Sequence, residues 1–284
     1  MSRLDSLAVQ TIIKNALQED IGPGDVTSEA ICTPDHIGQA VMRTKEACVV
    51  AGVPIAQMVF ATLDNEIEEI EFVPQVCDGD RLVPGQTIAE IKGRLRTILM
   101  GERTALNLLQ RLSGIATLTA RYVEAVQGFS AKILDTRKTA PGLRILEKYA
   151  VYVGGGHNHR IGLYDGILIK SNHIRAAGGV VAAIERARRY APIMLKIEVE
   201  VKNLAELREA LQAGVDRVML DNMSTEEMRQ AVQMTEGRVP LEASGGVSLD
   251  NVRQIAATGV DFISVGALTH SAKAIDMHLE VLAA

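Results

Sequence analysis

The second half of this chain alternates short β-branched runs with amphipathic helical stretches, and this alternation limits its possible folds more than any other feature. Helical patterns at 203–213 and 224–234, for example, separate successive runs. Strands connected through helices pair in parallel, so the pattern predicts a parallel sheet, either open or closed into a barrel. The runs that predict strands are Lys132–Leu134, Gly166–Ile169, Leu195–Val199, Arg217–Leu220, Pro240–Leu241 and Phe262–Val265.

The part before about residue 110 has a different character, typical of a small α+β domain. An apolar stripe at helical spacing predicts a helix from Leu4 to Glu19, which the sequence Gly22-Pro23-Gly24 ends. Alternating residues at 38–50 and a turn-strand-turn-strand pattern at 78–88 predict short strands. A long helical pattern then runs from Leu95 to about Gln127.

Composition excludes several classes of protein. With 47% hydrophobic residues the chain can bury a core, so it is not disordered. A net charge of −5 disfavours bulk binding of nucleic acid. The three cysteines form no CxxC pair, so we expect three buried thiols in a reducing cytoplasm rather than a disulfide or zinc site. The N-terminus lacks the apolar stretch of a signal peptide, and the most apolar segment, 47–63, is too interrupted to span a bilayer.

Small or ionisable residues gather where the predicted strands of the second half end. In parallel α/β folds the carboxyl ends of the strands form the rim at which active sites lie, so these residues predict one shared site. They are Asp135–Lys138, Lys170, Glu198, Glu200, Asp221–Asn222, Ser244–Gly246 and Gly266.

The cations of this rim predict a small polyanionic ligand. Residues 135–175 contain seven Lys/Arg and only three Asp/Glu. Arg137, Lys138 and Lys170 directly follow predicted buried strands, where a cation is costly without an anionic partner. In the glycine-rich loop that ends in His159-Arg160, two further donors to a carboxylate stand side by side.

The glycines of the rim indicate phosphate binding, and its acids indicate contact with a metal or with sugar hydroxyls. Glu198 and Glu200 point the same way on a strand, and with Asp221 they could hold Mg²⁺ or sugar hydroxyls, or instead pair with the rim lysines. Ser244–Val247, before a helix that we expect Ser248 to cap, and Val265–Ala267 could bind phosphate through backbone N–H groups.

Arg103 and Arg111 lie eight residues apart on one face of a predicted helix, 96–112, which by itself indicates only a solvated face.

Long motifs closely resemble the quinolinate phosphoribosyltransferase family, over nearly the whole chain. The sequence Asp135-Thr136-Arg137-Lys138-Thr139-Ala140-Pro141-Gly142 carries the resemblance, with Ala140 standing where a second Thr is common. Further matching segments are Gly24–Ser28, Arg103–Thr117, Gly154–Leu163, Leu168–Ile174, Glu198–Val201, Leu220–Met223, Glu242–Gly246 and Ser264–Thr269.

This resemblance implies a fold and a reaction. The fold is an N-terminal α+β sandwich-like domain, 1–110, followed by an incomplete TIM-like α/β barrel, 111–270, with a tail at about 271–284 that packs back on the first domain. The reaction transfers phosphoribosyl from phosphoribosyl pyrophosphate to quinolinate, giving nicotinate mononucleotide, pyrophosphate and CO₂ with Mg²⁺, a step of de novo NAD synthesis. The resemblance further implies a homo-oligomer, a dimer or larger, in which Arg103 of the partner subunit completes the site.

The resemblance also implies the role of each site residue. Arg137, Arg160, His159 and the partner's Arg103 would bind the two carboxylates of quinolinate, and Arg111 would be a further site arginine. Lys138 and Lys170 would neutralise phosphates, while Glu200 and Asp221 would hold Mg²⁺ or the ribose hydroxyls; these four are the expected catalytic residues. The remaining substrate contacts are Thr136, Ser244, Gly245, Gly246, Val265, Gly266 and Ala267.

Three other functions fit parts of the pattern. A related phosphoribosyltransferase could act on nicotinate or serve molybdenum metabolism, although a mono-acid does not need Arg103, Arg137 and Arg160 together. An aldolase-type barrel could use Lys138 or Lys170 as a Schiff-base amine, which borohydride trapping would detect. A non-catalytic barrel could bind a pyridine or a nucleotide without turnover.

Overall fold

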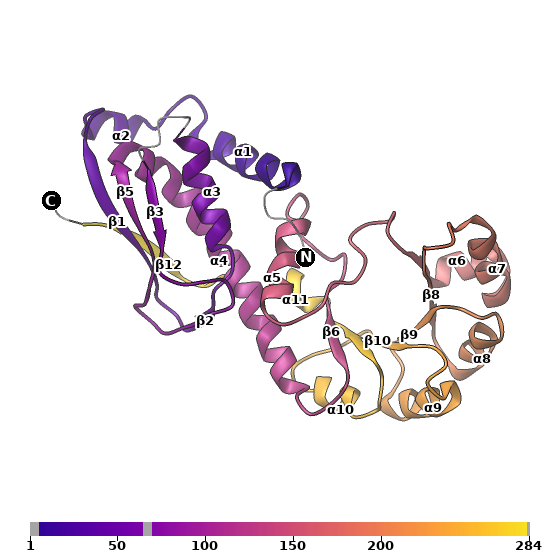
Figure 1. The fold of residues 1–284 in the computed structure, drawn as a ribbon. Helices are drawn as coiled ribbons and strands as arrows, with labels where there is room; N and C mark the ends of the chain where they lie inside the picture. The colour runs from indigo at the N-terminus through magenta and orange to yellow at the C-terminus, as the bar shows by residue number, and fades with distance from the viewer. Residues whose placement is uncertain (1–5, 65–69, 283–284) are drawn as a thin grey trace. The chain divides into compact units, whose positions relative to one another are not determined.

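The computed structural model describes residues 6–64 and 70–282, and the chain divides into two compact units (Figure 1). The first unit comprises Met1–Leu118, Ala140–Gly155 and Ser271–Ala284, and the second comprises Thr119–Thr139 and Gly156–His270. These bounds differ from the predicted domains 1–110 and 111–270. The difference arises because α4 (Leu95–Ala125) continues without a break past residue 110, and because α5 (Arg144–Val153) belongs to the first unit.

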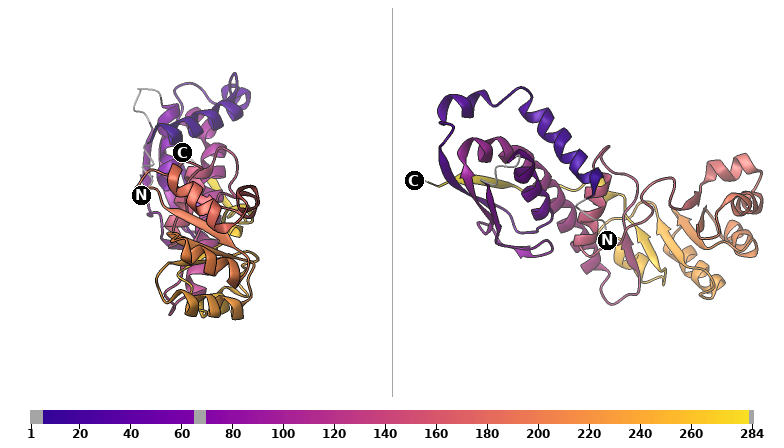
Figure 2. Two further views of the ribbon diagram at one scale, coloured as in Figure 1. Left: turned by 90° about the vertical axis from the view of Figure 1, so that its right-hand side faces the viewer. Right: turned by 45° about the horizontal axis from the view of Figure 1, so that its top comes forward.

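The first unit is built on a four-stranded antiparallel sheet in the order β12-β1-β5-β3. The C-terminal strand β12 pairs with β1 between Ala40–Val281 and Thr44–Met277, so distant parts of the chain share one sheet (Figure 2). Phe60 of α3 stacks on Phe72 of β3, with ring centroids 5.8 Å apart. The elements of this unit are α1 (Leu7–Ile21), α2 (Val26–Ile31), β1 (Ile37–Thr44), β2 (Cys48–Val49), α3 (Val53–Leu63), β3 (Glu71–Pro74), β4 (Arg81–Leu82), β5 (Thr87–Arg94) and β12 (Met277–Val281).

Helix α1 confirms the first predicted helix with shifted ends. The side chain of Ser6 accepts a hydrogen bond from the Val9 amide and caps the helix, and Gly22 at φ 52° ends it. Of the predicted range, Leu4 lies outside the described residues.

The second unit contains a six-stranded parallel sheet in the order β6-β11-β10-β9-β8-β7. Within the described ranges β6 and β7 lie at the two edges of this sheet, which confirms a parallel α/β fold that does not close completely into a barrel. The strands are β6 (Lys132–Leu134), β7 (Ile167–Ile169), β8 (Ile197–Val201), β9 (Arg217–Asp221), β10 (Leu241–Ser244) and β11 (Phe262–Ser264). The helices are α6 (Ser171–Ala177), α7 (Val180–Tyr190), α8 (Leu204–Gln212), α9 (Thr225–Thr235), α10 (Val252–Ala256) and α11 (Ala267–His270).

Two local predictions in this unit are wrong. The strand predicted at Pro240–Leu241 lies at Leu241–Ser244, because proline has no amide hydrogen to donate to a strand ladder. The helix expected to begin at Ser248 begins at Val252, because the Ser248 amide donates to Asn251 Oδ1 in a turn that precedes the helix.

The cysteines and the helices bear on the expected cellular setting. Cys32 and Cys48 are buried, but Cys77 is exposed in the turn before β4, so the expectation of three buried thiols is wrong for Cys77. Across residues 6–64 and 70–282, no helix combines the length and the apolar character that a bilayer span needs.

Asp78 joins three parts of the first unit. Its carboxylate accepts hydrogen bonds from the amides of Gly52 and Val53, at 2.9 Å each, and so caps α3, whose own N-cap residue Gly52 offers no side chain. The Tyr149 hydroxyl donates to the same carboxylate at 2.7 Å. Burial, together with the Asp78 carboxylate, raises the pKa of Tyr149.

Replacing Asp78 with Ala should therefore destabilise the fold. The change removes the cap of α3 and leaves the Tyr149 hydroxyl without its acceptor, which together cost about 2–4 kcal/mol of unfolding free energy. Tyr149→Phe, the control, loses one hydrogen bond and should cost about 1 kcal/mol. Urea unfolding measures both; a D78A variant within about 0.5 kcal/mol of wild type would contradict the capping role.

Candidate active site

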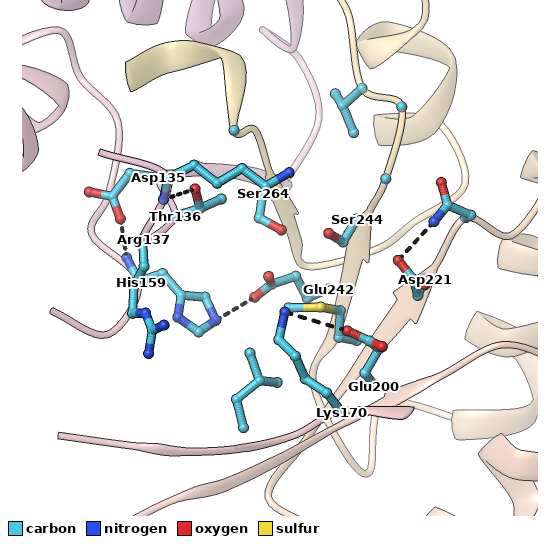
Figure 3. A pocket seen from close by; sticks show the side chains of 18 of the residues that line it. Asp135, Thr136, Arg137, His159, Lys170, Glu200, Asp221, Glu242, Ser244 and Ser264 are labelled. Atoms are coloured by element: carbon cyan, nitrogen blue, oxygen red, sulfur yellow. Dashed lines mark hydrogen bonds and ion pairs between the residues drawn. The ribbon is translucent and has the colours of Figure 1, made fainter. Parts of the chain in front are cut away.

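The second unit contains a cavity of about 670 Å³ at the carboxyl ends of its strands (Figure 3). Every residue that lines the cavity belongs to this unit. The strand order brings together one polar residue from the end of each strand, although these residues are far apart in the sequence. From the β6 edge to the β7 edge they are Thr136, Ser264, Ser244, Asp221, Glu200 and Lys170.

Two arginines lie close together at this cavity. Burial lowers the pKa of Arg160, and the positive charge of the nearby Arg137 lowers it further. Arg160 Nη1 donates to the Gly166 carbonyl at 2.8 Å, which fixes its guanidinium, whereas Arg137 Nη1 is buried and has no hydrogen-bond partner within residues 6–64 and 70–282. A buried guanidinium nitrogen without a partner is costly, so this site is arranged for an anion that supplies acceptors.

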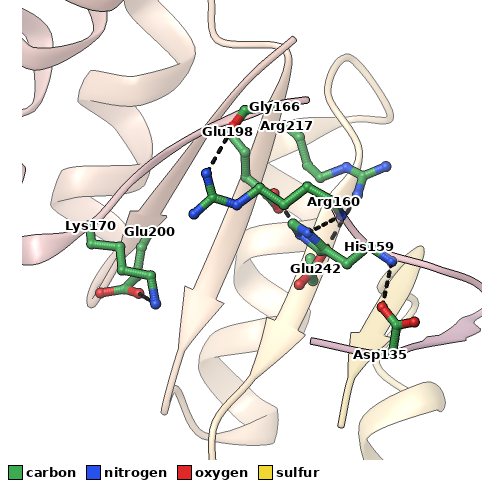
Figure 4. Close-up of polar contacts among 9 residues, drawn as sticks. All are labelled: Asp135, His159, Arg160, Gly166, Lys170, Glu198, Glu200, Arg217 and Glu242. Atoms are coloured by element: carbon green, nitrogen blue, oxygen red, sulfur yellow. Dashed lines mark hydrogen bonds and ion pairs between the residues drawn. The ribbon is translucent and has the colours of Figure 1, made fainter. Parts of the chain in front are cut away.

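A buried ionic network lies beside Arg160 (Figure 4). His159 Nε2 lies 2.9 Å from Glu198 Oε2 and 3.4 Å from Glu242 Oε2, and Arg217 Nη1 lies 3.5 Å from Glu242 Oε2. Burial alone would lower the pKa of His159, but the two carboxylates outweigh it and raise the pKa to about 9. The imidazole is therefore a cation at neutral pH, although its Nδ1 must give up the hydrogen bond that it accepts from the Arg160 amide.

Asp135 fixes the loop that carries His159. Its side chain is fully buried at the end of β6. One oxygen accepts the His159 amide at 2.8 Å and the other accepts the Asn158 side chain at 2.6 Å. Because both oxygens are used within the protein, Asp135 serves to position the loop rather than to bind a ligand.

The acids Glu200 and Asp221 line the cavity from the adjacent strands β8 and β9. Glu200 Oε1 accepts from the Ser171 hydroxyl at 3.0 Å, and its Oε2 lies 3.8 Å from Lys170 Nζ. Asp221 Oδ1 accepts from the Asn222 side chain at 2.9 Å. Carboxylate oxygens of this kind suit Mg²⁺ or sugar hydroxyls, so the donor set fits either ligand.

A different group of side chains, His159, Glu198 and Glu242, places one potential metal-ligand atom each within 4.8 Å of the others. Arg217 already pairs with Glu242, and the His159 nitrogen that faces the acids carries a proton when the ring is charged. We therefore interpret this group as an ionic network and not as a metal site.

Glycines allow the chain to come close to the cavity on two strands. Gly245 has φ 95°, and a Cβ there would lie 2.2 Å from Asn222 Oδ1. A Cβ on Gly266 would lie 2.9 Å from Lys138 Cδ. Gly245 therefore requires glycine, whereas a side chain at Gly266 would displace the flexible Lys138 side chain. At both positions the missing side chain leaves the nearby backbone open to a ligand.

The cavity is lined by most of the residues that the sequence nominated. They are Thr136, Arg137, Lys138, His159, Arg160, Lys170, Glu200, Asp221, Ser244, Gly245, Gly246, Gly266 and Ala267. Val265 is buried and does not line it, because its amide donates to the Leu134 carbonyl within the sheet. Arg103 and Arg111 belong to the first unit, where Nε and Nη2 of Arg111 both donate to one oxygen, Oε1, of the buried Glu147.

Several lining residues were missed as site residues. Glu242 and Ser264 come from the strands themselves, and His270 is the last residue of α11. Asp135, which the sequence nominated as a rim residue, also lines the cavity. The sequence signal for Glu242 and Ser264 was a polar residue next to or within an otherwise apolar run at the end of a predicted strand.

Comparison with known proteins agrees over the whole chain. Residues 25–113 match the family model described as quinolinate phosphoribosyl transferase, N-terminal domain, and residues 115–280 match that of its C-terminal domain. A probable nicotinate-nucleotide pyrophosphorylase [carboxylating] of Bacillus subtilis is 43% identical over 278 residues, 98% of this chain and 95% of that protein. A quinolinate phosphoribosyltransferase [decarboxylating] of Nicotiana tabacum is 42% identical and covers 95% of this chain and 81% of its own. Among solved structures, NadC from Streptococcus pyogenes matches with a TM-score of 0.94 and 44% identity, covering 100% of both chains.

The raised pKa of His159 predicts that the stability of the fold depends on pH. Because the pKa is about 6.5 in the unfolded chain and about 9 in the folded protein, the stabilisation is complete below pH 6.5 and disappears as the pH rises through 9. The unfolding free energy of wild type should exceed that of His159→Gln by on the order of 2 kcal/mol near pH 6. This difference should shrink toward pH 10. Urea unfolding of both proteins across this range measures it, and a difference independent of pH would contradict the ionic network.

Proposed function

The chain belongs to the quinolinate phosphoribosyltransferase family, and we propose that the cavity of its second unit carries out the reaction of that family. In this reaction phosphoribosyl passes from phosphoribosyl pyrophosphate to quinolinate, and decarboxylation gives nicotinate mononucleotide, pyrophosphate and CO₂. The chain is thus a phosphoribosyltransferase of NAD biosynthesis.

The unpaired buried nitrogen of Arg137 carries this assignment more than any other observation. Burial and the nearby charge of Arg137 lower the pKa of Arg160, although the Asp165 and Glu198 carboxylates partly oppose this shift. Arg137 Nη1 is buried and has no hydrogen-bond partner among the described residues. A substrate with two carboxylates supplies the acceptors that such a pair lacks. A mono-acid would leave part of this buried positive charge unmatched, which favours quinolinate over nicotinate.

The opposite side of the cavity suits the phosphoribosyl group. The glycines at 245, 246 and 266 leave room for a 5′-phosphate, and Lys138 passes beside Gly266. Glu200 and Asp221 offer acceptors to the ribose hydroxyls. Lys170 lies at the β7 edge, where an ammonium would neutralise pyrophosphate.

The chemistry requires positioning and charge rather than a protein nucleophile. Pyrophosphate departs with the electron pair of its bond to ribose C1, and the pyridine nitrogen uses its lone pair to form the new bond. The pyridinium then stabilises the electron pair that the leaving CO₂ deposits on the ring carbon, which takes up a proton from water. The two arginines hold both ring carboxylates until one departs as CO₂, and the other remains on the product.

We propose Mg²⁺ as the metal cofactor. Glu200 and Asp221 would hold it, since both acids reach the cavity from adjacent strands and offer the oxygen ligands that this ion prefers. Bound Mg²⁺ would supply charge neutralisation of the pyrophosphate leaving group. We also propose a reducing cytoplasm as the setting, because the exposed thiol of Cys77 is free.

One assay tests the function directly. The protein is incubated with phosphoribosyl pyrophosphate, Mg²⁺ and either quinolinate or nicotinate, and release of CO₂ and nicotinate mononucleotide is measured. We expect product from quinolinate, loss of turnover with a chelator of Mg²⁺, and little or no product from nicotinate. A preference for nicotinate, or no turnover with quinolinate, would overturn the dicarboxylate assignment.

We propose in addition a homo-oligomer, at least a dimer, in which the partner's Arg103 completes each cavity. Arg103 is exposed on α4, and its nearest acid is its own neighbour Glu102, at 3.9 Å. Its guanidinium is therefore available to a second subunit.

Mixing two inactive variants tests this sharing. Arg103→Ala and Arg137→Ala should each abolish most activity, but a mixture refolded together forms heterodimers with one intact site. Random pairing at equal amounts should then restore about one quarter of wild-type activity. If the mixture stays as inactive as its components, Arg103 does not act across subunits.

A further inference from the structure

Glu242 has one carboxylate oxygen that the protein leaves unused. The residue lies within β10, has no solvent-exposed surface and yet is among the residues that line the cavity. Its Oε2 faces His159 and Arg217 at 3.4 and 3.5 Å. Its Oε1 is buried and has no hydrogen-bond partner among the described residues.

The surroundings of this oxygen strengthen its electrostatic effect. Leu168 and Met219 contribute apolar side chains to the lining of the same cavity. Because Glu242 Oε1 is itself buried, water screens its charge poorly. Arg217 is itself held, because its guanidinium stacks over the Phe262 ring at 4.1 Å. The ion pair between Arg217 and Glu242 Oε2 fixes the carboxylate in place before any substrate binds.

A fixed negative charge in an anion-binding cavity needs an explanation. It opposes the phosphates and ring carboxylates that Arg137 and Arg160 attract, so it weakens the binding of the substrates in their ground state. It favours only a group that becomes positive during the reaction. In the proposed reaction such a group exists: as the bond from ribose C1 to pyrophosphate breaks, with its electron pair on the departing oxygen, the ribose becomes cationic, and the pyridine nitrogen then takes up the charge as its lone pair bonds to C1.

We propose that Glu242 is a further catalytic residue, whose free Oε1 stabilises the positive charge that develops on the ribose in the transition state. This inference rests on the proposed function. Ser264, on the neighbouring strand β11, lines the same cavity with a buried and unpartnered hydroxyl. It could donate to a ribose oxygen beside the carboxylate.

Glu198 offers a matched control within the same network. It is buried like Glu242 and lies closer to His159, at 2.9 Å, but it does not line the cavity. Both Glu242→Gln and Glu198→Gln remove one negative charge from His159. Only Glu242→Gln also removes charge from the cavity.

Steady-state kinetics of the two variants separate the roles. Glu242→Gln should lower kcat by about 100-fold or more, while KM for quinolinate stays unchanged or falls, because an anion loses a repulsive neighbour. Glu198→Gln should lower kcat by less than about 10-fold. A purely structural role would instead raise KM, lower kcat and reduce Tm to similar extents in both variants, and that result would overturn the proposal.

A binding measurement on wild-type protein keeps the proposal testable if Glu242→Gln does not fold or if quinolinate is not turned over. The probes are a ribose 5-phosphate analogue with a protonated ring nitrogen, which mimics the cationic sugar, and its neutral carbocyclic counterpart. By calorimetry with Mg²⁺ and pyrophosphate, the cation should bind at least about 10-fold more tightly. Equal affinity would overturn the role of Glu242, whereas absent turnover together with preference for the cation would overturn only the proposed function.

Discussion

The pairing of two buried carboxylates, Glu198 and Glu242, with His159 and Arg217 is the interaction on which the interior of the second unit depends. Charges buried in a sheet are very costly unless each has a partner, and here each partner comes from a different strand or loop. The network therefore couples the register of β8, β9 and β10 to the loop that follows α5. Because Asp135 binds the backbone of the same loop, His159 is held from two directions, and Arg160 follows it directly in the chain.

The buried polar atoms without partners indicate which groups a ligand of the cavity must supply. Among the described residues, Arg137 Nη1, Ser264 Oγ and Glu242 Oε1 are each buried without a hydrogen-bond partner. Other polar groups nearby, such as Asp135, are fully used by the protein. A protein that leaves a few buried groups unpaired beside many paired ones gives up stability at those points, and a substrate that pairs them recovers it on binding.

The sequence was sufficient to predict the strands and most of the rim, because polar residues that follow β-branched runs in a parallel sheet must meet at one edge. It did not reveal Glu242, because the strand was predicted to end at Leu241 and the glutamate was then a loop residue. A shift of the strand by a few residues turns the same side chain into a buried one. Val265, expected to contact substrate through its backbone, does not line the cavity for a related reason. Its amide donates to the Leu134 carbonyl of β6, a pairing that neither composition nor spacing can show.

Residue type alone also could not distinguish the arginines. Arg111 and Arg137 were both expected to bind substrate, but their partners differ. Arg111 is matched by the buried Glu147, which also accepts the amide of Ala140, just beyond the loop that carries Arg137. On the other side of that loop the Lys138 carbonyl accepts the Thr269 hydroxyl at 2.6 Å. The charge of Arg111 is thus used to hold the chain, whereas Arg137, on the neighbouring loop, keeps a buried nitrogen without a hydrogen-bond partner among the described residues.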